Sequence, residues 1–144
     1  MATDFQVTFD ARDPALLAAF WAEAMGYVEE PPPPGYDTWE AFARKTGIPE
    51  SDWDRYRAII DPAGVGPRFF FQRVPEPKNA KNRMHLDLNV GGGREASEGE
   101  RRDRVGGAAA RLDGLGATVV RSVEEQGSFW IVMEDPEGNE FCLQ

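Results

Sequence analysis

Cysteine and histidine occur once each in this chain of 144 residues. The single cysteine, Cys142, excludes an internal disulfide and a cysteine-based zinc cluster, and it fits a reducing compartment. The lone histidine, His85, raises the question of whether it is a metal ligand, an acid or base, or only a polar side chain on a sheet. The answer depends on which residues the fold brings beside it.

Positive charge and long apolar runs are also scarce. The chain has 16 lysines and arginines against 25 aspartates and glutamates, a formal net charge of −9. This balance disfavours nucleic acid and anionic membrane partners, because both require a basic surface. No run of about 18 apolar residues occurs, and the first residues, MATDFQVTFDARD, lack the basic and apolar regions of a signal peptide. We therefore expect one cytoplasmic domain, residues 1–144, whose partner is a small molecule.

Alternation and capping residues predict the elements of the first half. The segment FQVTFDA alternates apolar and polar residues, as a half-buried strand does. A helix is predicted from the capping residue Asp13 to the left-handed stop Gly26. The segments RAII and PRFFFQRV, joined by DPAG, predict a hairpin. The apolar side chains of the helix recur at helical spacing and should pack on the sheet: Leu17, Phe20, Trp21 and Ala24.

Residues 29–56 are predicted to be an insertion between this helix and the hairpin. The segment opens with four prolines, which favour an extended connection. Two short helices should follow, one around residues 39–45 and one after Pro49 that contains Trp53 and Tyr56. The aromatic residues either line a pocket for an apolar substrate or only dock the insertion. They are Trp39, Phe42, Trp53 and Tyr56.

The second half has a similar pattern. RMHLDLNV, residues 83–90, predicts a strand whose polar face carries His85, Asp87 and Asn89. A helix is predicted at Glu98–Leu115, with Val105, Ala109 and Leu112 on one face. The segments ATVVRSV, SFWIVME and NEFCLQ predict three further strands, the last two joined by DPEG.

A glycine-rich segment, GGGREA, follows the strand that contains His85. It matches the dinucleotide-binding pattern G-x-G-x-x-A, which requires a buried strand before it. A strand with a polar face does not meet that requirement, because the first strand of a Rossmann fold is apolar on both faces. We therefore predict a flexible loop and no nucleotide site.

The two halves repeat one plan. Each has a strand with a polar face, a helix that ends at glycine, and a hairpin whose last strand ends in glutamine: DPAGVGPRFFFQ and DPEGNEFCLQ. A duplicated unit predicts two βαβββ modules, residues 1–76 with the insertion and residues 83–144. The fold class is therefore α+β, with a cupped sheet of mixed and antiparallel strands.

Three segments resemble the vicinal oxygen chelate superfamily: FQVTFDARDPALLAAFWAEAMGY, RMHLDLNV and VMEDPEGNEFCL. That superfamily groups glyoxalase I, fosfomycin-resistance proteins, extradiol dioxygenases and bleomycin-resistance proteins. The likeness is greatest to its bacterial glyoxalase-like domain proteins. It covers the chain except the insertion, which we expect to replace the usual short second strand. The superfamily includes isomerases, transferases, oxygenases and non-catalytic binders, so the resemblance predicts the fold better than the function.

The resemblance also implies where metal ligands would lie, because in members that bind metal they come from the first and last strands of each module. Gln6 and His85 take the first-strand positions, and Glu140 takes the last-strand position of the second module. A neutral glutamine is a weak ligand, so a Zn, Ni, Fe or Mn ion would be held loosely or be absent. The last strand of the first module leaves three positions open, the third being our tentative ligand: Arg68, Phe70 and Gln72.

Two functions follow from the resemblance. The first is a metal-dependent lyase, isomerase or dioxygenase, in which His85 holds the metal and Glu140 is the catalytic residue that moves a proton. The alternative is a non-catalytic protein that sequesters a small, antibiotic-type molecule, for which the acidic chain favours a cationic ligand. A homodimer is also expected, since many family members pair. The side chains expected to bind substrate are Thr8, Trp39, Phe70, Asp87 and Trp130.

Each site residue also has an ordinary structural interpretation. His85 can be a hydrogen-bonded polar group, Glu140 a solvated residue at a hairpin end, and Cys142 a small buried residue instead of a nucleophile. A purely structural module stays open if Phe70 and Trp130 fill the cavity.

Overall fold

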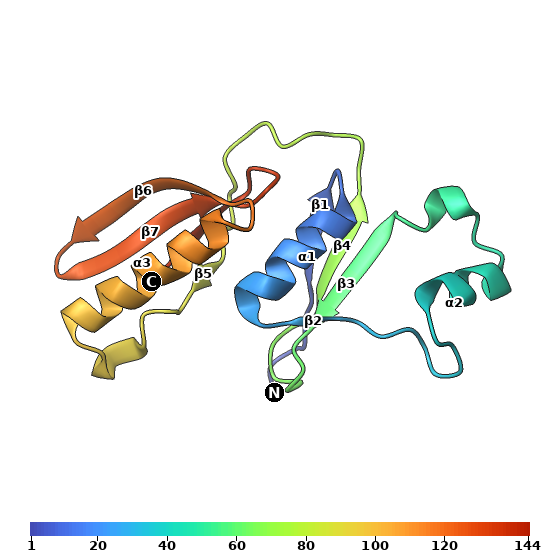
Figure 1. Cartoon of the computed structure of the whole chain (residues 1–144), viewed down its shortest axis with the longest axis horizontal. Coiled ribbons are helices and arrows are strands. Elements are labelled where there is room, and N and C mark those ends of the chain that lie inside the picture. Colours follow the sequence, from blue (N-terminus) through green and yellow to red (C-terminus); the bar gives the residue numbers. More distant parts are fainter. The chain divides into compact units, whose positions relative to one another are not determined.

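All 144 residues are described by the computed structural model, and the chain forms two compact units, residues 1–77 and 78–144. Each unit holds a four-stranded mixed sheet and a long helix that packs on it (Figure 1). The element order of each unit, with the insertion set aside, is βαβββ. The prediction of an α+β fold built from two such modules is confirmed.

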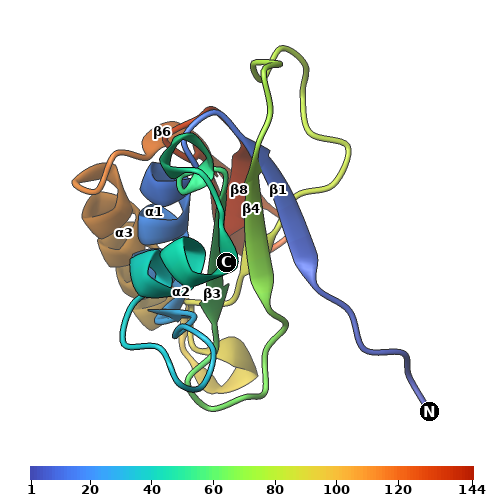
Figure 2. The same ribbon diagram turned by 90° about the vertical axis from the view of Figure 1, so that its right-hand side faces the viewer.

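The first unit has its strands in the order β1-β4-β3-β2, with β1 parallel to β4 and the other pairs antiparallel. Figure 2 shows β1, β4 and β3 side by side, with α1 to the left of them and α2 nearer the viewer. The elements are β1 (Val7–Ala11), α1 (Pro14–Met25), β2 (Val28–Glu29), α2 (Trp39–Thr46), the 3-10 turn η1 (Glu50–Asp52), β3 (Tyr56–Ile60) and β4 (Phe69–Arg73).

The core of the first unit lies between α1 and the apolar face of the sheet. The carboxylate of Asp13 caps α1 by accepting a hydrogen bond from the N–H of Leu16 at 3.1 Å, and Gly26 ends it at φ 70°. Phe69 and Phe71 of β4 are buried against the helix. Each such ring contributes about 1.5–3 kcal/mol by leaving water. The buried stripe of the helix is the predicted one: Leu17, Phe20, Trp21 and Ala24.

The insertion differs from the prediction in two places. Its second helix is only the turn η1, because Tyr56 pairs with Gln72 as the first residue of β3 and the ladder takes the chain away from helical geometry. The short second strand is not replaced, since Val28 pairs with Ile60 as β2. The insertion is therefore an addition that follows β2.

The second unit has the strand order β5-β8-β7-β6, with β5 parallel to β8. This is the order of the first unit, strand for strand. Its elements are β5 (Asp87–Leu88), the 3-10 turn η2 (Gly93–Glu95), α3 (Glu98–Asp113), β6 (Thr118–Glu125), β7 (Ser128–Glu134) and β8 (Glu140–Leu143).

Helix α3 covers the apolar face of this sheet. Ser97 and Glu100 form a capping box at its start, each side chain bonded to the other residue's backbone N–H. The buried residues of the helix are the predicted ones, and they face the buried side chains of β7 and β8. The helix contributes Val105, Ala109 and Leu112, and the strands contribute Ile131, Met133, Phe141 and Leu143.

The strand predicted at residues 83–90 is shorter than expected. Only Asp87 and Leu88 form β5, and Met84 is 89% exposed, although it was expected on the core face. The ladder with β8 pairs Asp87 with Cys142 and Leu88 with Leu143. The segment before Asp87 is tied to β8 by the hydrogen bond from the N–H of Cys142 to the carbonyl of Leu86 at 2.9 Å. Part of the glycine-rich loop forms η2. None of the three α-helices combines the length and apolar character needed to cross a bilayer.

Candidate functional site

The polar faces of the two sheets have the same register. In the first unit Thr8 of β1 lies opposite Phe70 of β4. In the second unit Asp87 of β5 lies opposite Cys142 of β8. Both pairs belong to the parallel ladder between the first and last strand of a module, so they are structurally equivalent.

A second pair of contacts gives the same equivalence. The side-chain amide of Gln72 donates to Asp10 at 2.8 Å, and the amide of Gln144 donates to Asn89 at 3.0 Å. In each module a glutamine near the end of the last strand contacts the residue two positions after Thr8 or its equivalent, Asp87. The repeat found in the sequence therefore extends to individual hydrogen bonds.

Two residues earlier on each strand lie the positions where the resemblance implies metal ligands. Gln6 is then the counterpart of His85, as the sequence predicted, and Arg68 is the counterpart of Glu140. Gln72, our tentative ligand, takes the position of Gln144 instead. The register thus selects one of the three positions that the sequence left open.

Arg68 makes three contacts within the first unit. Its Nη1 donates to Oε1 of Gln6 at 3.0 Å. Its Nε and Nη2 donate to the two carboxylate oxygens of Glu30 at 2.9 and 2.7 Å, a bidentate pair. The guanidinium also lies 5.1 Å from the ring centroid of Phe70. A permanent cation therefore lies at the position where the resemblance implies a metal ligand in the first module.

Glu140 is held by cationic and backbone donors of the second unit. Nζ of Lys78 lies 3.2 Å from Oε1 and 3.1 Å from Oε2, and the N–H of Asn82 donates to Oε2 at 2.9 Å. Partial burial opposes ionisation of the carboxyl, but these donors outweigh it and the pKa of Glu140 is lowered. A carboxylate with a lowered pKa is a poor proton carrier near neutral pH.

These donor sets do not fit a divalent metal at the position that the resemblance implies. Arg68 offers no lone pair and repels a cation, while the oxygen of Gln6 already accepts from it. Both oxygens of Glu140 are occupied by Lys78 and Asn82. Neither module therefore offers the free donor atoms that a divalent metal at this position requires.

The Lys78 contact predicts a pH-dependent contribution of Glu140 to stability. The folded pKa lies below the ordinary 4.5, so the contribution is fully present above that value and is lost as pH falls through the folded pKa. In urea titrations, Glu140→Gln should therefore lose more unfolding free energy at about pH 7 than at about pH 3. Glu125→Gln, at the exposed end of β6, removes a charge from a residue that is not paired with Glu140 and is the matched control. An equal loss at both pH values would contradict the prediction.

The first unit contains a pocket of about 710 Å³ between the polar face of its sheet and the insertion. This volume lies in the range that holds small organic ligands. Its aromatic walls come from α2, the segment after it, β3 and β4: Trp39, Phe42, Trp53, Tyr56 and Phe70. Six carboxylates and three guanidinium groups complete its charged lining: Glu29, Glu30, Asp37, Glu40, Asp52, Asp54, Arg55, Arg57 and Arg68.

The aromatic walls are fixed by hydrogen bonds and ring contacts. Nε1 of Trp39 donates to the carbonyl of Glu30 at 2.8 Å, and Nε1 of Trp53 donates to the carbonyl of Ile48 at 3.0 Å. The rings of Tyr56 and Phe70 stack with their centroids 5.4 Å apart. Indoles held in this way keep one orientation, so the pocket is formed before a ligand enters.

The residues expected to bind substrate lie in both units. Trp39 and Phe70 line the pocket of the first unit, whereas Thr8 is absent from its lining and accepts a hydrogen bond from Gln6 at 3.2 Å. Asp87 and Trp130 belong to the second unit, where Asp87 contacts His85.

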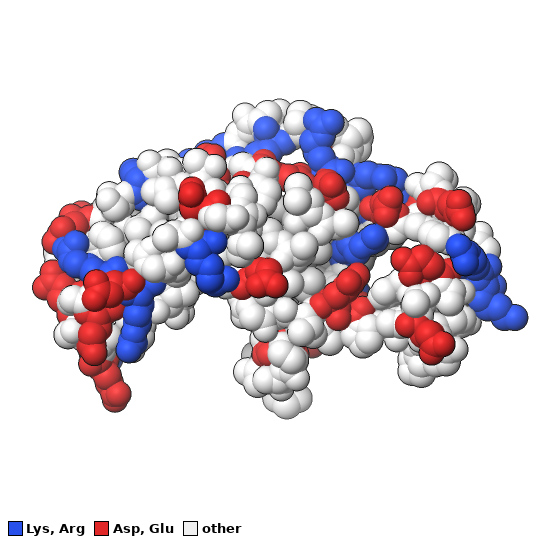
Figure 3. Space-filling model, viewed as in Figure 1, with Lys and Arg blue, Asp and Glu red and all other residues white.

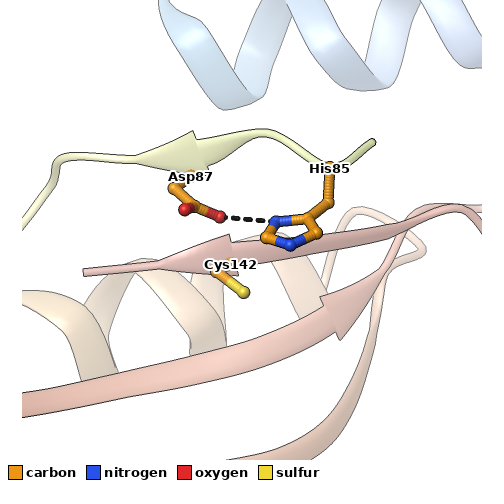
Figure 4. Close-up of side chains that lie close together, drawn as sticks. All are labelled: His85, Asp87 and Cys142. Carbon is orange, nitrogen blue, oxygen red and sulfur yellow. Dashed lines mark hydrogen bonds and ion pairs between the residues drawn. The ribbon is translucent and has the colours of Figure 1, made fainter. Parts of the chain in front are cut away.

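His85, Asp87 and Cys142 form a cluster on the polar face of the second sheet, and Figure 4 shows their side chains close together. Nδ1 of His85 lies 2.8 Å from Oδ1 of Asp87, and one ligand atom from each residue lies within 4.8 Å of the other two. Burial, followed by the Asp87 carboxylate, raises the pKa of the Cys142 thiol. A thiol with a raised pKa is a poor nucleophile, which favours the structural interpretation of Cys142 over the nucleophilic one.

Sequence reasoning missed the partners of the site residues. Lys78 and Asn82 lie in PEPKNAKN, between the strand segments predicted for the two modules. The carboxylates of the pocket lie in the insertion, where no periodic pattern marks them. The one available signal was the density of acidic and aromatic residues between positions 29 and 56.

Comparison with known proteins agrees with this architecture. The family model for the glyoxalase-like domain matches residues 6–144. No curated protein matches the chain. A solved structure from Burkholderia phytofirmans PsJN, described as a glyoxalase/bleomycin resistance protein/dioxygenase family enzyme, is 17% identical with a TM-score of 0.60. The alignment covers 98% of this chain and 97% of that chain.

Two fosfomycin resistance proteins have similar folds. A mutant of FosX from Listeria monocytogenes, complexed with Mn(II) and a dihydroxypropylphosphonic acid, is 12% identical with a TM-score of 0.62, covering 100% of this chain and 90% of that chain. FosX from Mesorhizobium loti is 11% identical with a TM-score of 0.64, covering 100% and 91%. At these identities the likeness establishes the fold and leaves the function to be argued from the residues.

Proposed function

The chain belongs to the glyoxalase-like domain family, and within it we propose that this protein binds and sequesters a small aromatic cation without transforming it. The observation that carries the proposal is the pocket of about 710 Å³ in the first unit. It is lined by aromatic rings whose orientations are already fixed, which reduces the entropy that a ligand must lose on binding.

The charge of the pocket selects the ligand. Six carboxylates stand against three guanidinium groups, so an excess of negative charge faces the space. Figure 3 shows acidic and basic side chains interleaved around α2 and η1. Ion pairs within the lining, such as Arg57 with Asp54 at 3.2 Å, neutralise only some of the six carboxylates. A ligand cation would complement this excess.

The rings of the pocket already contact cations of the protein. The guanidinium of Arg44 lies 5.1 Å from the ring centroid of Trp53, and that of Arg55 lies 5.7 Å from Tyr56. Such distances allow the attraction between a positive charge and an aromatic face. The same attraction would act on a cationic ligand, and stacking on Tyr56 and Phe70 would favour a flat one.

The metal-dependent lyase, isomerase or dioxygenase, our first hypothesis from the sequence, is not the function we propose. One of the positions implied for its metal ligands is Arg68, whose guanidinium is a cation without a lone pair to donate. Its proton carrier, Glu140, forms an ion pair with Lys78. A binding protein requires neither group to act as a ligand or a base.

The proposal is tested with two probes of opposite charge, the acridinium cation proflavine and the anion naphthalenesulfonate. Proflavine should raise the melting temperature and quench tryptophan fluorescence, because a ligand selective for the folded state stabilises it. Naphthalenesulfonate should do neither. Proflavine released by denaturing the complex should have its original mass.

Two results would contradict the proposal. Equal stabilisation by the anion and the cation would show that charge does not select the ligand. Recovery of a chemically altered ligand would show turnover in place of sequestration. Glu40→Gln tests the charge argument directly, since it removes a pocket carboxylate that is not an ion-pair partner of Arg55, Arg57 or Arg68, and it should weaken proflavine binding.

A further inference from the structure

We propose that His85, Asp87 and Cys142 form a site for a thiophilic divalent cation such as Zn²⁺, contained within the second unit. The cluster unites the single histidine and the single cysteine of the chain. It is separate from the pocket of the first unit, whose lining includes none of these residues.

The ladder between β5 and β8 brings the three side chains together. Asp87 and Cys142 are direct partners in the parallel pair, and side chains at such positions lie on the same face. Backbone bonds fix the segment that carries His85, since the N–H of Cys142 donates to the carbonyl of Leu86 at 2.9 Å. His85 lies two positions before Asp87, on the face that Asp87 shares with the cysteine (Figure 4).

The donor set matches the chemistry of zinc. Imidazole, carboxylate and thiolate are its three usual protein ligands. When the metal binds, the thiol proton passes to solvent, so the thiolate and the carboxylate balance the charge of the dication. Three protein ligands leave the fourth tetrahedral position to water.

The donors are close enough to be drawn into one coordination sphere. Their ligand atoms lie within 4.8 Å of one another, whereas donors about 2.0–2.3 Å from a tetrahedral zinc are separated by roughly 3.3–3.8 Å. Coordination therefore requires side-chain rotations that bring the sulfur closer and separate Nδ1 of His85 from Oδ1 of Asp87, which lie 2.8 Å apart. His85 and Asp87 have the freedom for this, since their side chains are 43% and 41% exposed.

This site differs from the one that the family resemblance implies. It replaces Glu140, which Lys78 and Asn82 hold, with the neighbouring Asp87 and Cys142. The first module has no equivalent, because its counterpart of Cys142 is Phe70. The site is therefore a property of the second module alone.

Titration with Co²⁺ tests the proposal, because cobalt bound to thiolate gives a near-ultraviolet charge-transfer band and Cys142 is the one thiol of the chain. The full-length, reduced protein should develop this band at about one equivalent, and Zn²⁺ should abolish it by displacement. Cys142→Ser should remove the band, and His85→Gln and Asp87→Asn should each weaken Co²⁺ binding about tenfold or more. Circular dichroism of each variant confirms that it is folded.

Two controls separate this site from other sources of binding. Glu134→Gln removes a carboxylate from the same sheet outside the cluster and should leave the Co²⁺ affinity unchanged. Glu140→Gln should leave the band in place. Absence of the band in the wild-type protein, or its persistence in folded Cys142→Ser, would overturn the proposal. The proposal would also be overturned if Glu140→Gln removed the Co²⁺ charge-transfer band and Asp87→Asn did not weaken Co²⁺ binding. Proflavine binding is measured separately, so failure of one proposal does not decide the other.

Discussion

Replacing Phe70 with alanine is expected to weaken proflavine binding about ten- to hundredfold. Phe70 lies on β4, lines the pocket and stacks on Tyr56 with a centroid separation of 5.4 Å. The substitution removes an aromatic face on which a flat cation would lie, and a ring contact that excludes water is worth about 1.5–3 kcal/mol. Isothermal titration calorimetry measures the change in affinity directly.

A matched phenylalanine outside the pocket provides the control for this experiment. Phe129 is half-buried in the second unit and has the guanidinium of Arg102 4.6 Å from its ring centroid, much as Phe70 has that of Arg68. Phe129→Ala should therefore leave the affinity for proflavine unchanged. If both variants bind proflavine equally well, the pocket is not the binding site.

Replacing Phe141 with alanine is expected to lower the unfolding free energy by about 3–5 kcal/mol. Phe141 lies on β8 and is fully buried in the core of the second unit, which also contains Leu112 and Met133. Alanine would leave a cavity that these neighbours fill only in part, so lost contacts add to the lost transfer free energy. Urea titration followed by circular dichroism measures the loss.

The location of this effect can be checked independently. Amide hydrogen exchange should accelerate in α3 and β7, since both pack around Phe141. Leu115→Ala serves as the control because its side chain is 42% exposed, and it should cost less than a third as much. A loss for Phe141→Ala no greater than for Leu115→Ala would contradict the packing described above.

The parts of the fold that depend on local patterns could be predicted from the sequence. Helix α1 lies between Asp13 and Gly26 as the capping residues indicated, because cap preferences depend on neighbouring backbone groups alone. The two modules followed from the repeated hairpin sequence. Tyr56 was misassigned to a helix, since its place is decided by pairing with the distant Gln72.

The site was less predictable because its chemistry depends on long-range register. The sequence left Arg68, Phe70 and Gln72 open, since a strand's period of two gives all three residues the same face. Only the pairing of Thr8 with Phe70 makes Arg68 the counterpart of Glu140. No pattern in the sequence pairs Lys78 with Glu140 either, because the two residues are 62 positions apart.

The guanidinium of Arg68 lies 5.1 Å from the ring centroid of Phe70, so in the proposed complex it would compete with the ligand cation for that ring. A ligand cation that stacks on this ring must displace the guanidinium of Arg68, which is also held by two hydrogen bonds to Glu30. The measured affinity is then a difference between two similar contacts, and it falls by the fraction of time that Arg68 is in place. A compact cation that only replaces Arg68 on the ring of Phe70 gains little binding free energy. A broad one that also covers the exposed ring of Tyr56 gains more, so the pocket should discriminate by the area of the ligand as well as by its charge.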